Sequence, residues 1–406
     1  MRILHTSPFL PYPPEDGGRL IAWNQIRGLA ARGHMLDLVV PLRRPEDPGN
    51  VAVLEKIGRV HTVDIPARAD ALTAVSALGH NRSLRIERHA LSDVSAAMER
   101  ALAGEDANAP DLVFLDSLFT AYLAPVVRRV RPRTPCVLLQ HNVESQVFDR
   151  LVERSDQGTL KLLRGWEAPR IRRAEREAAV AVDRVLTLSA EDARTMEALA
   201  PGCRTAVCGP GIPTYPGETI PPPAAGDTVL FLGSYRWPPN VDGARWLASE
   251  IWPLVRARRP EARLVLAGAD PQGVIAPLAD TALGIETPGF VEDAVATVRS
   301  AAVCVVPLRA GGGIRLKILE ALANERALVT TTVGGEGLGL VPERHAAFAD
   351  EPAAFADAVV SALEHPEGSA AMARGGRRHV EAEFSWDAAI ARLESILEGV
   401  RAEGRA

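Results

Sequence analysis

The sequence lacks long apolar runs, is poor in cysteine and lysine, and carries no excess of positive charge. No apolar run approaches the ~20 residues that a helix needs to span a bilayer. The amino terminus turns polar and proline-rich after four residues, so we expect no secretory signal. The four cysteines have neither metal-ligand spacing nor the density of a disulfide scaffold, which favours reduced thiols, no metal centre and a cytoplasmic protein. Any contact with the inner face of a membrane is expected to be peripheral.

The charge balance excludes a general attraction for polyanions. The formal net charge is −5, so we expect no nucleic-acid partner, and any anion site must be local. Only Lys56, Lys161 and Lys317 are lysines, and Lys317 stands close behind a run of three glycines. A length of 406 residues, 47% of them hydrophobic and 24% charged, predicts an ordinary globular chain with two domains.

Short apolar runs alternate with helix-length amphipathic segments, which predicts parallel sheets covered by helices. In the first block we predict a helix over 18–32 and strands over 2–7, 35–42, 60–65, 111–116, 136–140 and 184–188. In the second block we predict helices over 241–258 and 314–324 and strands over 229–232, 263–267, 303–307 and 327–331. The tail over 353–401 reads as two or three helices.

A stretch rich in proline and glycine over 209–226 separates the two blocks and predicts a linker. We therefore predict domains over 1–212 and 228–380, a linker over 213–227, and a final helix over 381–406 that crosses back to the first domain. The expected fold class is α/β, with two doubly wound Rossmann-like domains facing a central cleft. Ligands of such folds bind at the carboxyl ends of the strands, so function is expected in that cleft.

The most informative segment is a glycine loop that joins a predicted buried strand to a predicted helix. Gly311, Gly312 and Gly313 let the backbone approach a ligand closely, and the free N–H groups that begin the helix attract an anion. Arg315 and Lys317 place positive charge at the end of the helix where the dipole disfavours it, which suggests a bound anion. We interpret the segment as a diphosphate site. The alternative is a flexible turn with solvated basic residues.

Several motifs together resemble those of glycosyltransferase family 4, a group of retaining enzymes with the GT-B fold. The similarity covers nearly the whole chain, and it rests on GGGIRLKILEALA from Gly311, TTVGGEGL from Thr331, LAARGH from Leu29, HNVE from His141, GSYRWPPN from Gly233 and GFVED from Gly289. The resemblance implies an acceptor-side first domain and a nucleotide-sugar-binding second domain. It also implies metal-independent transfer from a nucleotide-diphosphate-sugar, the co-substrate, to a sugar, lipid-linked or other hydroxyl acceptor, with no cofactor, in surface glycan or glycoconjugate biosynthesis.

The resemblance assigns roles to residues of the second domain. Glu320 matches the second glutamate of the family's paired-glutamate motif and is expected to bind the donor ribose. Gly312 stands where the family has the first glutamate, and the family's arginine and lysine pair is reduced to Arg236. Arg315 and Lys317 are expected to supply the missing positive charge at the reacting diphosphate.

Further site residues follow predicted strands. The family uses the first glycine loop against the donor phosphate, which here implies Gly17, Gly18 and Arg19. His141 is implied as a contact to the donor sugar near the reacting centre, and Glu336, in a glycine turn, as a contact to the nucleotide or sugar.

Each of these residues also has a structural interpretation. The first loop fits a tight turn at a helix start, a lone histidine is more often structural than catalytic, and Glu336 fits an ordinary loop carboxylate. Glu320 alone fits an exposed residue pairing with Lys317, a contact worth ~0.2–0.5 kcal/mol. For the remaining polar residues at strand ends, the structural interpretation is favoured: Asp116, Ser117 and Ser189.

The mechanism implied by the resemblance is front-face attack, in which the departing diphosphate helps to accept the acceptor proton and the protein stabilises developing charge. Two other classes stay open on the residues alone, a nucleotide-sugar epimerase of the same architecture and a nonenzymatic nucleotide-sugar-binding protein. An epimerase needs carboxylates or histidines placed for proton abstraction. The donor base and sugar, the acceptor and the linkage are not settled by the sequence.

Overall fold

The computed structural model describes residues 1–43, 48–65, 77, 81–104, 109–153, 158–223, 226–270, 272–311 and 314–405. These residues form two compact units. The first consists of Met1–Gly211 together with Trp386–Ala406, and the second of Ile212–Ser385. Among the described helices, none is both long enough and apolar enough to cross a membrane.

The first unit is built on a parallel sheet with strand order β3-β2-β1-β4-β5-β6-β7. Its inner strands are continuous apolar runs because helices cover both faces of a parallel sheet. All five residues of β4 and of β5 are buried, which confirms the predicted strands there. The strands are β1 (Arg2–Thr6), β2 (Met35–Arg43), β3 (Arg59–Ile65), β4 (Leu112–Asp116), β5 (Cys136–Gln140), β6 (Arg184–Thr187) and β7 (Thr205–Val207).

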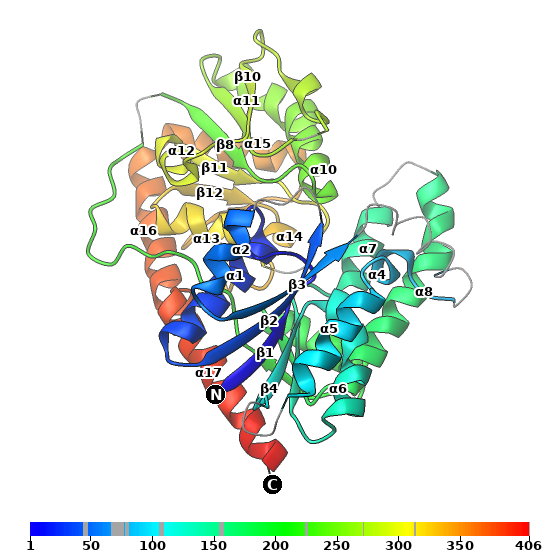
Figure 1. Ribbon diagram of the computed structural model, residues 1–406. Helices are drawn as coiled ribbons and strands as arrows, with labels where there is room; N and C mark the ends of the chain where they lie inside the picture. The colour runs from blue at the N-terminus through cyan, green and yellow to red at the C-terminus, as the bar shows by residue number, and fades with distance from the viewer. Residues whose placement is uncertain are drawn as a thin grey trace. The chain divides into compact units, whose positions relative to one another are not determined.

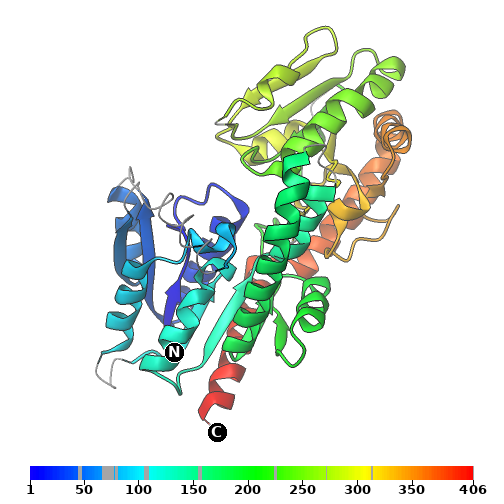
Figure 2. The same cartoon turned by 90° about the vertical axis from the view of Figure 1, so that its right-hand side faces the viewer.

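Helices connect these strands (Figure 1), and α8, at 24 residues, can be followed in Figure 2. The helical elements of this unit are α1 (Gly17–Ala31), α2 (Pro48–Glu55), α4 (Leu84–Glu87), α5 (Ser92–Leu102), η2 (Leu118–Leu123), α6 (Ala124–Val130), α7 (Glu144–Glu153), α8 (Gly158–Ala181), α9 (Ala190–Leu199) and α17 (Trp386–Arg405). Helix α1 begins where the Asp16 side chain accepts a hydrogen bond from the Arg19 amide, and it ends before Gly33, whose φ is +85°.

Helix α17 packs against α1 at close range. A Cβ on Gly28 would lie 2.6 Å from Ile390 Cγ1, so the glycine allows the two helices to approach. The Glu394 carboxylate binds Arg32 at 3.0 Å and His34 at 2.8 Å. The last helix of the chain is therefore an integral part of the first unit.

The second unit has a parallel sheet with strand order β10-β9-β8-β11-β12-β13. Its strands are β8 (Thr228–Leu232), β9 (Arg263–Ala267), β10 (Ile285–Gly289), β11 (Val303–Val306), β12 (Ala327–Thr330) and β13 (Ala347–Phe348). Its helical elements are α10 (Pro238–Trp246), η3 (Leu247–Ile251), α11 (Trp252–Arg258), η4 (Ala276–Leu278), α12 (Ala294–Ser300), α13 (Leu316–Ala323), α14 (Thr332–Gly335), α15 (Pro352–Glu364) and α16 (Pro366–Glu383). The helix predicted over 241–258 is thus α10 and α11 joined by a π-helical turn, η3.

The chain crosses between the units twice, at neighbouring points. Within the second unit, the Ile212 amide donates a hydrogen bond to the Phe384 carbonyl at 2.8 Å. Within the first unit, Gly211 lies so close to Trp386 that a Cβ would be 2.4 Å from the indole. The boundary predicted at residue 381 falls inside α16, and the second unit ends at Ser385.

Candidate active site

The carboxyl ends of β8 and β11 form the switch point of the second sheet, because β8 is flanked by β9 on one side and β11 on the other. Crevices at such points are where open α/β sheets bind ligands. Gly233 directly follows β8, and a Cβ there would lie 2.6 Å from Lys317 Nζ and 2.9 Å from Asn240 Nδ2. The sequence-predicted lysine therefore lies at the expected edge of the sheet.

Two side chains hold the Lys317 amino group there. Its Nζ donates a hydrogen bond to Asn240 Oδ1 at 2.7 Å and lies 4.7 Å from the centre of the Phe231 ring. Burial lowers the pKa of Lys317 to about 7, with Glu320 acting to raise it and Arg315 to lower it further. An amino group with this pKa gains strongly from a neighbouring anion.

Arg315 is the N-cap residue of α13, and its guanidinium extends toward α14. The residue is buried, and its Nη2 donates to the Val333 carbonyl at 3.0 Å. Arg315 thus contacts α14, which follows β12, and Lys317 contacts α10, which follows β8. The first turn of α13 has no acidic residue. Both predicted cations lie at the head of this helix.

Gly311 has a φ of +125°, and a Cβ on it would lie 2.9 Å from the Trp237 ring. Only glycine fits both the backbone angle and the space. Gly312 and Gly313, which were predicted to bind the donor with it, lie outside the described residues.

Side-chain contacts tie the loops of this edge together. The Arg309 guanidinium binds the Asp242 carboxylate of α10 through two hydrogen bonds, at 2.6 and 3.1 Å. Thr331 caps α14 by accepting from the Gly334 amide, and its hydroxyl donates to the Leu308 carbonyl. These contacts fix Leu308 and Arg309, which follow β11, against the neighbouring segments.

The other predicted residues of the second unit lie at the same edge or on the same helix. Glu320 is half-buried on α13, and burial raises the pKa of its carboxyl while Lys317 acts to lower it. It is therefore not the exposed helix residue of the structural alternative. Glu336 is the half-buried C-cap residue of α14, and Arg236 is exposed in the turn after β8.

The first sheet carries a second polar cluster at its own switch point, between β1 and β4. Asp116, the last residue of β4, accepts hydrogen bonds from His141 Nε2 at 2.5 Å and from the Ser7 hydroxyl at 2.9 Å. Ser7 follows β1, and His141 follows β5. The sequence pointed to His141 as a site residue and to Asp116 as a structural one, and their pairing was not predicted because contact across strands is a tertiary property.

The charges in this cluster reinforce one another. Burial acts to lower the pKa of His141, but the Asp116 carboxylate outweighs it and the pKa is raised. Burial acts to raise the pKa of Asp116, and His141 outweighs that effect so that this pKa is lowered. His5, stacked on Phe114, has its pKa lowered to about 4 by burial and stays neutral. Each residue of the pair His141 and Asp116 thus favours the charged form of the other.

The first glycine loop leads into the start of α1. Gly17 and Gly18 begin α1, and Arg19 forms ion pairs with Glu15 at 3.5 Å and Asp16 at 3.6 Å. The Arg19 charge is therefore already balanced by its neighbours. The structure thus shows a capped helix start here, and donor binding by this loop stays a prediction.

Ser117 and Ser189 have structural roles. Ser117 accepts a hydrogen bond from the Phe119 amide and caps η2 with a φ of +84°. Ser189 caps α9 by accepting from the Asp192 amide at 3.0 Å. Both agree with the structural interpretation that the sequence favoured.

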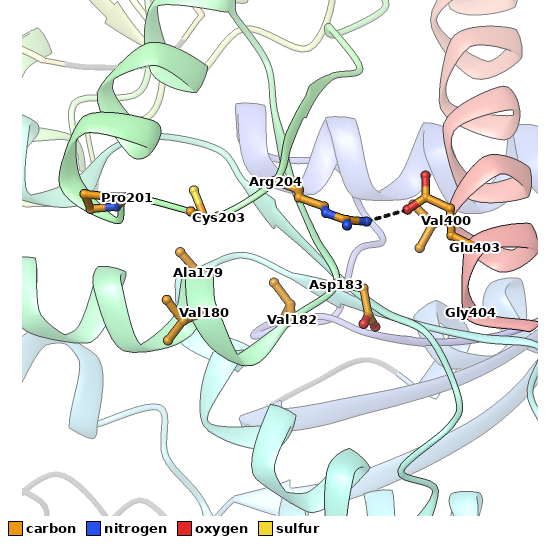
Figure 3. Close-up of a pocket in the computed structure, with 11 residues that line it drawn as sticks. Ala179, Val180, Val182, Asp183, Pro201, Cys203, Arg204, Val400, Glu403 and Gly404 are labelled. Carbon is orange, nitrogen blue, oxygen red and sulfur yellow. Dashed lines mark hydrogen bonds and ion pairs between the residues drawn. The ribbon is translucent and has the colours of Figure 1, made fainter. Parts of the chain in front are cut away.

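The first unit also has a cavity of about 450 Å³ away from this cluster (Figure 3). Its lining includes Asp183, just before β6, and Arg204, just before β7, where an Arg204–Glu403 ion pair of 2.9 Å joins α17. The cavity thus lies at the amino ends of the strands, opposite the edge that carries His141.

Family comparison covers most of the chain. Residues 16–211 match the model described as "Glycosyl transferase 4-like domain", and residues 226–365 match "Glycosyl transferases group 1". The chain belongs to the family 4 type of glycosyltransferases. It is therefore an enzyme, and its reaction is that of a nucleotide-sugar glycosyltransferase. The predicted two-domain α/β fold of the GT-B type is confirmed.

Two curated relatives are similar in sequence. An "uncharacterized 44.6 kDa protein in cps region" of Klebsiella pneumoniae is 22% identical over 382 residues, which cover 90% of this chain and 92% of that protein. A GDP-mannose-dependent monoacylated alpha-(1-6)-phosphatidylinositol monomannoside mannosyltransferase of Corynebacterium glutamicum is 30% identical over 162 residues, 36% of this chain and 41% of that protein.

Solved structures share the fold over the whole chain. Sucrose-phosphate synthase of Thermosynechococcus elongatus matches with a TM-score of 0.73 at 17% identity, covering 99% of this chain and 100% of that one. Anabaena HepE in complex with UDP-glucose matches with a TM-score of 0.67 at 14% identity, covering 98% and 100%. At these identities the likeness shows the fold.

Proposed function

We propose that the protein is a retaining glycosyltransferase that binds the diphosphate of its nucleotide-sugar donor at the head of α13. The observation that carries the proposal is the position of Lys317, whose amino group lies at the switch point of the second sheet beside Gly233. Amides at the start of α13 and the Arg315 guanidinium add donors and positive charge to the same end of the helix.

The low pKa of Lys317 favours the binding of an anion at this site. Burial costs the ammonium form free energy, so the lysine is only partly protonated near pH 7. A diphosphate supplies the missing counter-charge, restores full protonation and gains a charge-assisted hydrogen bond. As the bond from the sugar to the diphosphate breaks, negative charge grows on the phosphate oxygens, where this lysine stabilises it.

Retention is proposed because the sequence resembles a family of retaining enzymes. The acceptor oxygen attacks the anomeric carbon on the face that the diphosphate leaves, and the departing diphosphate takes the acceptor proton. No protein nucleophile is needed, so the chain's task is to orient the donor and stabilise charge. Glu320, Glu336 and Arg236 are proposed as donor contacts and His141 as the sugar contact, its ring oriented by Asp116.

The physiological role we propose is surface glycan or glycoconjugate biosynthesis. The Klebsiella relative that matches over 90% of the chain is described as lying in a cps region, and the Corynebacterium relative glycosylates a lipid-linked acceptor according to its name. A sugar or lipid-linked hydroxyl is therefore the proposed acceptor, and the reaction is proposed to need neither metal nor cofactor.

The test is a thermal-shift screen with UDP- and GDP-sugars, followed by transfer assays with the donor that binds. We expect one nucleotide class to raise the melting temperature, turnover to persist in EDTA, and the product anomer measured by NMR to match the donor anomer. Product of inverted configuration would overturn retention. Formation of an epimer without acceptor would favour an epimerase, and binding with neither transfer nor hydrolysis would favour a nonenzymatic role.

A further inference from the structure

Asn240 is a buried polar residue of the second unit that the resemblance does not assign. It lies in the first turn of α10 and is 3% exposed. Its two side-chain atoms have separate partners: Oδ1 accepts from Lys317 Nζ at 2.7 Å, and Nδ2 donates to the Ser234 carbonyl at 2.7 Å. Its backbone N–H also donates to the Trp237 carbonyl at 3.0 Å. The side chain is thus fixed at both ends.

We propose that Asn240 is a positioning residue of the donor site, which orients the Lys317 amino group toward the diphosphate of the nucleotide-sugar. The proposal rests on the proposed function, since it names the residue through which the α13 lysine is placed. Asn240 acts through Lys317 and is not itself proposed to touch the reacting atoms.

The surroundings of the lysine leave few other means of holding it. From β8 and α10, the groups that face Nζ are the Phe231 ring, Gly233 and Asn240, and these are all neutral. The charged groups that shift the pKa of the amino group are Glu320 and Arg315, and both belong to α13 or to its N-cap. Asn240 is therefore the described side-chain oxygen that fixes where Nζ points.

An asparagine suits this position better than an acidic residue. An aspartate would pair with the ammonium in the empty site and would also repel the incoming diphosphate. A neutral amide oxygen holds the lysine in place and leaves its charge to be balanced by the donor. The family has a lysine in the segment that follows the first strand of the second domain, and this chain lacks it. Here Asn240 of the same segment accepts a hydrogen bond from Lys317, which lies 77 residues further along the chain.

The experiment measures the affinity for UDP-glucose and GDP-mannose by calorimetry from about pH 6 to about pH 9, across the titration of the lysine. The variants are Asn240→Ala, Asn240→Asp, Lys317→Ala and the double variant Asn240→Ala with Lys317→Ala. Asn324→Ala is the matched control, because Asn324 is also buried and hydrogen-bonded in this unit, to the Glu320 carbonyl and to Arg299. Melting temperatures identify losses that come from folding alone.

We expect Asn240→Ala to weaken donor binding about tenfold, the effect of losing one hydrogen bond to a charged group. The midpoint of the pH dependence should move to lower pH in Asn240→Ala and to higher pH in Asn240→Asp, because the first removes and the second strengthens the group that favours the ammonium form. The double variant should bind no more weakly than Lys317→Ala. Asn324→Ala should change the melting temperature and leave the pH midpoint unmoved.

The inference is overturned if Asn240→Ala keeps the affinity and pH midpoint of the unmodified protein, or if its loss adds in full to that of Lys317→Ala. Those outcomes leave the proposed function intact, since the unmodified protein still binds the donor. If the unmodified protein binds neither nucleotide-sugar, or if Lys317→Ala binds and transfers as well as the unmodified protein does, both the proposed diphosphate site and the role of Asn240 are wrong. Asn240→Asp, which preserves the side-chain shape, serves if the alanine variant does not fold.

Discussion

His141, which is half-buried, and the buried Asp116 form a hydrogen-bonded pair in which imidazole Nε2 lies 2.5 Å from a carboxylate oxygen, although 25 residues separate them in sequence. The pair joins the carboxyl ends of β4 and β5, which are adjacent strands. Because the pKa of His141 is raised and that of Asp116 lowered, each residue favours the charged form of the other. The stability of the first unit should therefore depend on pH through this pair.

The His141–Asp116 pair should make its full contribution to the stability of the fold only within a window of pH. The folded pKa of His141 is above its ordinary 6.5, so its contribution is full below pH 6.5 and is lost as pH rises through the raised value. The folded pKa of Asp116 is below 3.8, so its contribution is full above pH 3.8 and is lost as pH falls through the lowered value.

The variant Asp116→Asn tests this pair, because it keeps the shape and removes the charge. NMR titration should show the His141 pKa falling, and denaturant unfolding should show that the loss of stability on alkalinisation is weaker. If His141 contacts the sugar, His141→Ala should lower kcat/KM about ten- to a hundredfold, as expected for a lost charged hydrogen bond. An unchanged His141 pKa in Asp116→Asn would contradict the pairing.

Replacing Lys317 should raise the stability of the protein and lower its turnover. The folded pKa of about 7 lies below the ordinary 10.5, so the unfolded chain binds the proton more tightly and the apo protein loses stability as pH falls from 10.5 to about 7. Lys317→Met removes this penalty and should raise the melting temperature at pH 7. It should also reduce kcat about 10²- to 10³-fold, the usual effect of losing one donor to developing charge. Normal turnover would refute the role of Lys317.

The sequence predicted those parts of the fold whose signal is local. Strand β5 was predicted to the residue, because five consecutive buried residues leave a continuous pattern. Strand β10 was missed because it lies at the sheet edge, alternates in burial and contains Pro288, which removes a backbone donor. Gly311, Arg315 and Lys317 were selected as candidates from the loop and helix pattern, whereas Asn240 and Asp116 make their contacts with distant segments, which the local pattern does not show.

Gly311→Ala should damage the donor site more than an ordinary glycine substitution. The residue has a φ of +125°, and a Cβ would lie 2.9 Å from Trp237, so alanine must strain the backbone and displace the indole. We expect a loss of about 1–3 kcal/mol in the free energy of unfolding together with weaker donor binding. Gly273→Ala is the matched control, since Gly273 has a φ of +64° with open space around it.

The comparison of these two variants is made by chemical denaturation and donor titration. Gly273→Ala should lose some stability through its backbone alone and keep the donor affinity. Equal affinities in the two variants would show that the space beside Trp237 does not shape the site.

The loop that follows Glu336 should loosen when His345 takes up a proton. His345 Nδ1 accepts a hydrogen bond from the Val341 amide at 3.1 Å, and its ring stacks on His379 at 4.8 Å, which in turn contacts the Leu338 carbonyl at 2.8 Å. Burial lowers the pKa of His345, followed by repulsion from His379, Arg344 and Arg378. Its stabilising effect is therefore full above pH 6.5 and is lost as pH falls below that value.

Protonated Nδ1 has no lone pair for the Val341 amide, so acidification should break that bond and place a cation against the second imidazole. The protection factor of the Val341 amide, which corrects its exchange rate for the intrinsic effect of pH, should fall below pH 6.5 more steeply than that of the Thr331 amide, which donates to the Val306 carbonyl. His345→Gln should show no such steepening, because its amide does not titrate. Equal pH dependence for the two amides in the unmodified protein would contradict the role of His345, and a parallel loss of donor affinity would extend that role to Glu336.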